Sequence, residues 1–142
     1  MPYKKISLIV FVALFFALLA PFSVYSKGGS YHSDDIATEV IVTIQDDKIL
    51  AFSAYSGNWV SEDIKLTERI LRKKSQGNIG IVVTTKRILG FSVITEEWTP
   101  ENLKINEIIE EIKVEGNVAT MKTDVRVIGF SAHTGKWTEA PQ

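Results

Sequence analysis

Three segments of six residues align without a gap: Lys48-Ile49-Leu50-Ala51-Phe52-Ser53, Arg87-Ile88-Leu89-Gly90-Phe91-Ser92 and Arg126-Val127-Ile128-Gly129-Phe130-Ser131. A tryptophan follows the phenylalanine of each segment by seven residues, at Trp59, Trp98 and Trp137. Both aromatic positions therefore recur every 39 residues, and a fixed period of this length is the signature of an internal structural repeat. The sequence predicts three tandem copies of one unit.

Short β-branched runs precede the three segments, at residues 40–44, 79–84 and 118–123. Two residues such as Asp46-Asp47 connect each run to the segment that follows, which is a length typical of a β-hairpin. A further turn, for example at Ser56-Gly57-Asn58, comes before each tryptophan. We therefore expect a third strand to begin at the tryptophan.

The fourth element of the unit has two interpretations, over residues 67–75 and 106–114. Ile105, Ile108 and Ile112 have helical spacing, and Pro100 could begin a helix. Ile108 and Ile112 are also same-face positions of a strand, and that strand would enter a hairpin through Gly116-Asn117. We expect the strand, which makes each unit a four-stranded antiparallel meander and the protein all-β; the helix would make it a β-β-α repeat.

A four-stranded meander of 39 residues resembles the blade of a β-propeller, and the resemblance covers residues 39–142. We divide this repeat domain into copies at 39–77, 78–116 and 117–142. The last copy ends before its fourth strand, and fewer than three full blades make only a partial ring. Short-chain propeller lectins close by oligomerising, so the resemblance implies a homo-oligomer.

The N-terminal 26 residues have the pattern of an export signal. Lys4 and Lys5 form a basic start, an apolar run covers residues 6–20, and the small Ser26 suits cleavage before Lys27. We expect residues 1–26 to be a signal peptide and 27–38 a linker, in a secreted or periplasmic protein. The alternative is an uncleaved anchor, because the apolar stretch is about long enough to span a bilayer. It would be the protein's one contact with a membrane.

Composition argues against several classes of protein. Without the two leader lysines, 14 basic residues face 17 acidic ones, so we expect no nucleic-acid partner. The chain has no cysteine for a thiolate metal site. Its two histidines, His32 and His133, fit no metal or catalytic spacing, and no catalytic motif is present. We predict no enzymatic activity, no cofactor and no metal site.

Two sets of repeated residues are candidates for ligand binding. Trp59, Trp98 and Trp137 either anchor the units or act as stacking platforms for a sugar. The first residues of the three segments either form a ring of cations for a carboxylate or sulfate, or pair with acids such as Glu68 and Glu107. These cations are Lys48, Arg87 and Arg126.

The repeats favour a binding function over enzymatic catalysis, because equivalent sites on several units strengthen weak contacts with a partner. We therefore expect a non-enzymatic, exported binding protein with repeated surfaces for a glycan or a protein partner. Two alternatives stay open: an envelope structural protein held by an uncleaved leader, and an enzyme with an unrecognised site.

Overall fold

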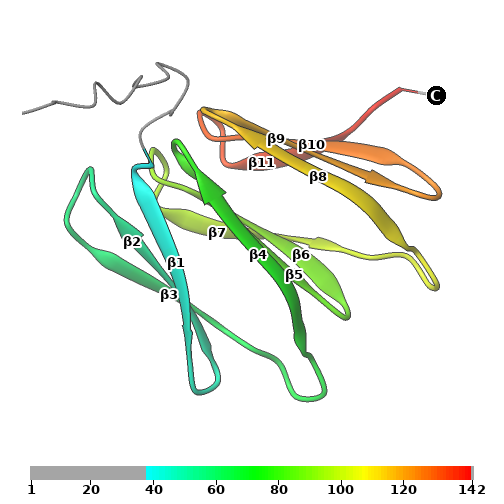
Figure 1. Ribbon diagram of the computed structural model, residues 1–142, viewed down its shortest axis with the longest axis horizontal. Coiled ribbons are helices and arrows are strands. Elements are labelled where there is room, and N and C mark those ends of the chain that lie inside the picture. Colours follow the sequence, from blue (N-terminus) through cyan, green and yellow to red (C-terminus); the bar gives the residue numbers. More distant parts are fainter. Residues whose placement is uncertain (1–37, 142) are drawn as a thin grey trace, which may run out of the picture. The chain divides into compact units, whose positions relative to one another are not determined.

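The computed structural model describes residues 38–141, which form eleven strands and no helix (Figure 1). The predicted all-β class is confirmed, and the helical interpretation of the fourth element is wrong. Pro100, the residue that could have begun a helix, lies in an edge strand, where its missing N–H costs no ladder hydrogen bond. The predicted leader and all but the last residue of the linker lie outside the described residues. Within 38–141, no helix is long and apolar enough to span a membrane.

The strands form three antiparallel sheets in chain order. The first sheet, ordered β1-β2-β3, consists of β1 (Val40–Gln45), β2 (Lys48–Ser53) and β3 (Trp59–Asp63). The second, ordered β4-β5-β6-β7, consists of β4 (Ile70–Gln76), β5 (Ile79–Thr84), β6 (Arg87–Ser92) and β7 (Glu97–Asn102). The third, ordered β8-β9-β10-β11, consists of β8 (Ile109–Glu115), β9 (Val118–Thr123), β10 (Val127–Ser131) and β11 (Lys136–Glu139).

The boundaries of the sheets differ from the expected boundaries of the copies. The fourth element pairs with the strand that follows it, so β4 and β8 open the second and third sheets. The last sheet therefore has four strands, and the sheet with three described strands is the first one. The physical reason is the length of the connections: a two-residue turn at Gly77-Asn78 forces β4 and β5 to pair, whereas residues 64–69 are long enough to cross between sheets.

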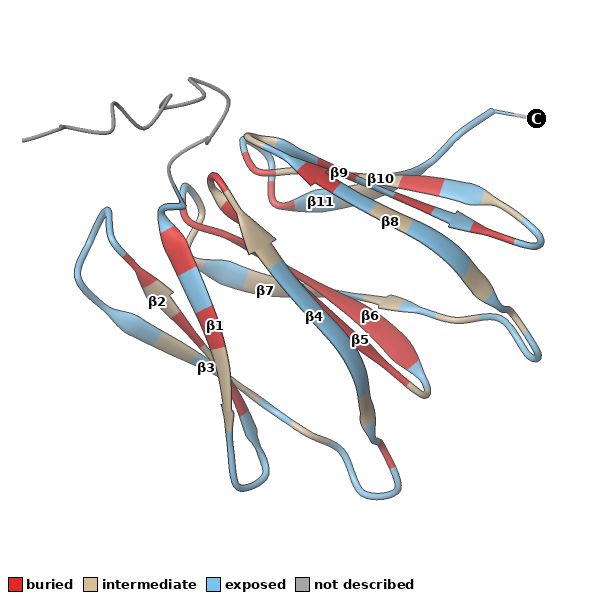
Figure 2. Cartoon of the chain, in the orientation of Figure 1, coloured by how far each residue is buried: buried red, intermediate tan, exposed pale blue. Residues whose placement is uncertain are grey.

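Successive sheets pack face to face. We call the face with Phe52, Phe91 or Phe130 the rear face of its sheet, and the opposite face the front face. Front-face residues of the first sheet pack against the rear face of the second, and the second packs on the third in the same way. The middle sheet is therefore covered on both sides, and every residue of β5 and β6 is buried (Figure 2).

Small residues and tryptophans set the spacing of the packed sheets. A Cβ atom on Gly90 would lie only 2.7 Å from the ring of Phe130, so glycine is what lets the next sheet approach. Each phenylalanine packs on the tryptophan of the neighbouring strand, with ring centroids 4.9 to 5.2 Å apart. The indole N–H of Trp98 donates to the Val60 carbonyl of the first sheet, and that of Trp137 donates to the Thr99 carbonyl of the second.

Candidate functional site

Arg87 joins the second sheet to the first through a buried ion-pair network. Its Nε donates to Glu68 Oε1 over 2.8 Å and its Nη2 to Glu68 Oε2 over 3.1 Å, which is a bidentate pair. Nη1 donates to Glu62 at 2.6 Å, and Nη2 also donates to the Asp63 carbonyl at 2.8 Å. Thr84 donates its hydroxyl to Glu68. We call Arg87, Glu62, Glu68 and the Asp63 carbonyl the first arginine clasp.

Arg126 repeats this arrangement between the second and third sheets. It makes a bidentate pair with Glu107, at 2.7 and 3.1 Å, and donates to Glu101 and to the Asn102 carbonyl. These four residues form the second arginine clasp, and each lies 39 positions after its counterpart in the first. The expectation that the arginines pair with Glu68 and Glu107 is confirmed.

The clasps perturb the carboxylates strongly. Burial by itself would raise the pKa of Glu68, but hydrogen bonds from Arg87 and Thr84 outweigh it and hold that pKa at about 2. Glu107 is in the same position: burial opposes ionisation, and hydrogen bonds from Arg126 and the Lys104 backbone keep its pKa at about 2. Both carboxylates are thus ionised at neutral pH. Their oxygens accept bonds from the clasp, an arrangement that suits a structural joint between sheets.

Lys48, the third predicted cation, lies in a different setting. Its ammonium group pairs with Asp63 in the neighbouring strand, and both side chains are largely exposed. Asp63 raises the pKa of Lys48 through this hydrogen bond. Only Lys48 of the three predicted cations is therefore accessible to an anion from solution, whereas Arg87 and Arg126 have side chains 3% and 6% exposed.

The three tryptophans also differ from one another. Trp98 and Trp137 are half-buried between sheets, and their N–H groups are bonded to main-chain carbonyls of the preceding sheet. Trp59 lies on the rear face of the first sheet and is 56% exposed. A stacking platform for a sugar is thus sterically open only at Trp59 among the three.

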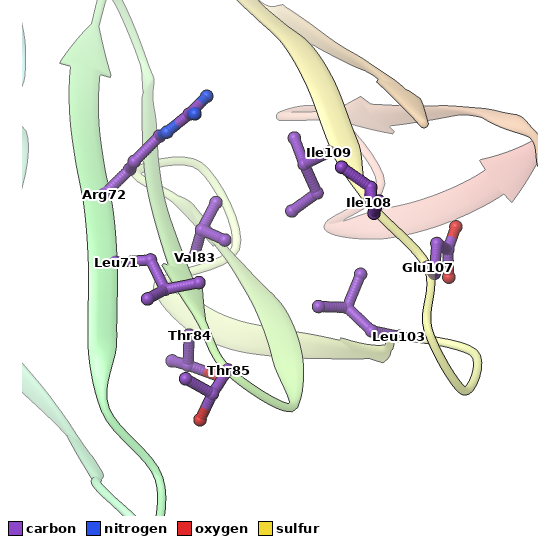
Figure 3. Close-up of a pocket in the computed structure, with 9 residues that line it drawn as sticks. All are labelled: Leu71, Arg72, Val83, Thr84, Thr85, Leu103, Glu107, Ile108 and Ile109. Atoms are coloured by element: carbon purple, nitrogen blue, oxygen red, sulfur yellow. The ribbon is translucent and has the colours of Figure 1, made fainter. Parts of the chain in front are cut away.

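A cleft that the sequence did not predict lies between the second and third sheets. It has a volume of about 350 Å³, and five apolar residues line it together with Arg72, Thr84, Thr85 and Glu107 (Figure 3). Leu71 and Val83 line one side of it and Leu103 and Ile109 the other, while Arg72 lies at the rim. We call this space the β4–β8 cleft. Leu71 and Ile108 were the only hint of the cleft in the sequence, as apolar residues among charged ones. They are 55% and 65% exposed, and only the packing of the sheets brings them to the same cleft.

The surroundings of the cleft are charged. Arg72, Lys73 and Lys74 are consecutive exposed residues of β4, and Lys73 donates to the Val42 carbonyl of the first sheet. The strand β4 is an edge strand of its sheet, so one side of its backbone is not paired with another strand among residues 38–141. A partly apolar cleft therefore lies beside a basic edge strand.

No group of three or more metal-binding side chains lies within residues 38–141. Comparison with known proteins finds no matching family model, no similar curated protein and no similar solved structure.

Proposed function

We propose that the protein is a non-enzymatic binding protein and that its β4–β8 cleft receives an apolar side chain of an extended, acidic segment of another protein. The observation that carries this proposal is the exposure of Leu71 and Ile108 at a partly apolar cleft of about 350 Å³. That volume is at the lower end of the range for ligand pockets and suits one or two side chains. Exposed apolar residues gathered at a cleft commonly mark a binding surface.

The rest of the proposed ligand follows from the neighbouring strand. An extended segment can add to an edge strand through main-chain hydrogen bonds, with alternate side chains entering pockets. Arg72 and Lys74 pair with Val83 and Ile81, which face the third sheet, so these two cations favour acidic residues beside the apolar anchor. A protein ligand suits the cleft better than a glycan, because none of the nine residues that line it is aromatic.

Peptide display tests the proposal. A library of random peptides is selected on the protein, and the selected peptides are measured against Leu71→Asp and against Leu66→Asp as a matched control. Leu66 is 91% exposed in the loop before β4 and does not line the cleft. We expect apolar peptides with acidic flanks that lose at least tenfold in affinity with Leu71→Asp and bind Leu66→Asp normally. Peptides that bind both variants equally would refute the cleft as the site.

A panel of immobilised glycans separates the two ligand classes. The protein and its Trp59→Ala and Leu71→Asp variants are applied in parallel. Glycan binding that Trp59→Ala abolishes and Leu71→Asp leaves intact would replace the proposed peptide site with a lectin site on the first sheet.

We also propose that the protein is exported and that its sheets have a propeller-like arrangement. The basic start, apolar run and Ser26 support export. Rear-to-front packing that repeats from sheet to sheet supports the arrangement. The mass of protein produced from the full-length sequence tests processing: loss of residues 1–26 is expected, and a retained leader would favour an anchored envelope protein.

A further inference from the structure

We propose that the rear face of the first sheet docks on the front face of the third sheet of a second copy of this chain. Both faces are uncovered by residues 38–141 and carry exposed apolar side chains. On the first sheet, Ile41 is 60% and Trp59 is 56% exposed; on the third, Val118 is 54% and Val127 is 42% exposed. The proposed contact would continue the rear-to-front packing that already joins the three sheets.

A vacant glycine position on the third sheet is the main observation. Gly129 is the repeat equivalent of Gly90, whose Cβ position lies 2.7 Å from Phe130. At Gly129 a Cβ atom would meet nothing closer than 3.9 Å, so the space that Phe130 fills above Gly90 is open above Gly129. Glycine in a central strand costs stability unless something packs closely on it. The equivalent phenylalanine, Phe52, lies on the uncovered rear face of the first sheet.

The two uncovered faces also carry the equivalents of a hydrogen-bond donor and acceptor that join neighbouring sheets within the chain. Trp137 donates to the Thr99 carbonyl across the joint between the second and third sheets. The repeat equivalents are Trp59 and Thr138, one on each uncovered face. In the proposed contact, the Trp59 indole of one copy donates to the Thr138 carbonyl of the other.

A second pair of polar groups follows the same rule. Asn78 donates through Nδ2 to Asn117 Oδ1, which links the strand-start turns of neighbouring sheets. Glu39, Asn78 and Asn117 are equivalent positions of the repeat. In the proposed contact, Asn117 of one copy would therefore face Glu39 of the other, whose carboxylate can accept from Asn117 Nδ2. The first and third sheets therefore both carry, at the positions that join sheets within one chain, a side chain that can take part in the proposed contact.

Two departures from the internal joints predict a weaker contact. Lys48 stands where the joints have Arg87 and Arg126, and Ala140 stands where the joints have the acidic partners Glu62 and Glu101. Lys122 stands on the front face where the second sheet has the buried Val83. The docked copies should hence dissociate on dilution, unlike the sheets within one chain.

Light scattering on protein produced from the full-length sequence tests the proposal. We expect the average mass to rise with concentration from one chain to at least two. Trp59→Glu alters only the rear face and Gly129→Val only the front face; each is expected to stay at the mass of one chain. Within a chain, a Cβ atom at Gly129 meets nothing closer than 3.9 Å. Leu66→Glu, in a loop outside both faces, is the control that should assemble normally.

Mixing the two variants gives the decisive result. The Trp59→Glu copy keeps an intact front face and the Gly129→Val copy an intact rear face, so an equimolar mixture should form a heterodimer with one native contact. A wild-type protein that stays monomeric would overturn the proposal. So would a mixture that stays monomeric, or variants that assemble as the wild type does.

Engineered cysteines give an independent measurement, because the chain has none of its own. A Cβ atom on Gly135 would lie 3.4 Å from Thr95 Cβ, close to the separation in disulfides. The equivalent positions across the proposed contact are Gly57 and Thr134. Gly57→Cys with Thr134→Cys should form a disulfide between chains, whereas Thr95→Cys with Gly135→Cys should form one within a chain. The internal disulfide without the intermolecular one would contradict the proposal.

Discussion

Two glycines in equivalent turns show how one position in the repeat acquires different roles. Gly77 and Gly116 have φ angles of 56° and 55°, in the left-handed region that favours glycine. A Cβ atom on Gly77 would lie 2.5 Å from the Gly116 carbonyl oxygen, whereas one on Gly116 would meet nothing within 4 Å. Backbone strain is thus common to both, and close packing of one turn on the next constrains only Gly77.

Alanine at these two positions separates strain from contact. We expect Gly116→Ala to lower the free energy of unfolding by about 1 kcal/mol, the cost of a left-handed conformation for a residue with a Cβ. Gly77→Ala should cost about 3 kcal/mol or more, because backbone must also move. Urea denaturation measures both values. Equal losses would show that the two turns are not in tight contact.

The connections between sheets depend on the arginine clasps. The loops that precede β4 and β8 contain Glu68 and Glu107, and each arginine ties its loop to the outer strand of the preceding sheet. Removing one partner of a buried pair leaves the other charge without compensation, at a cost of about 3–5 kcal/mol. The clasp residues are therefore committed to the stacking of sheets, and Glu107, which also lines the β4–β8 cleft, has both carboxylate oxygens bonded to Arg126.

The free energy of unfolding should fall in acid because the carboxylates of Glu68 and Glu107 become protonated. Their pKa of about 2 in the folded protein is below the ordinary value of 4.5, so the folded state holds fewer protons than the unfolded one. Their contribution is complete above pH 4.5 and is lost as the pH falls toward 2, at most about 3 kcal/mol for each carboxylate. Thermal denaturation across this pH range measures the loss.

Glutamine at both positions is the control for the acid effect. Glu68→Gln with Glu107→Gln should be less stable than the wild type at neutral pH, because each arginine loses its bidentate carboxylate partner and keeps only Glu62 or Glu101. Its stability should also change less between pH 4.5 and 2. A pH dependence as steep as that of the wild type would assign acid sensitivity to other groups.

Burial across the whole stack is uneven. The middle sheet packs on both neighbours, so its strands β5 and β6 are buried throughout, whereas the first and third sheets each have one face that residues 38–141 leave uncovered (Figure 2). Regions with more buried apolar contact open less often. We therefore expect the middle sheet to be the most stable of the three.

Hydrogen exchange on dilute protein tests this gradient at equivalent positions. The amides of Ile88 and Gly90 in β6 should exchange more slowly than those of Ile49 and Ala51 in β2. Both pairs occupy equivalent positions of a central strand, but the rear face of β2 is uncovered among residues 38–141, whereas both faces of β6 are covered. Equal protection would mean that the three sheets open together as one cooperative unit.

Local sequence patterns were enough to predict the 39-residue period, the all-β class and the hairpins. The repeated Phe-Ser segments and the two-residue turns act over short distances, where steric preference and side-chain alternation determine the structure. The pairing of Arg87 and Arg126 with Glu68 and Glu107 was also predictable, since opposite charges recur with the same period. The order of strands in each sheet was only partly predicted, because the copies were divided after the fourth strand instead of before it.

The β4–β8 cleft, the different exposure of Trp59 and the two other tryptophans, and the burial of the arginines depend on tertiary structure. A repeat makes its copies alike in sequence, but their surroundings differ according to whether another sheet covers them. Trp98 and Trp137 each meet a preceding sheet, whereas Trp59 meets none among residues 38–141. The sequence alone determined which residues are equivalent, and only packing between sheets, which joins residues far apart in the sequence such as Gly90 and Phe130, decided which of them are buried.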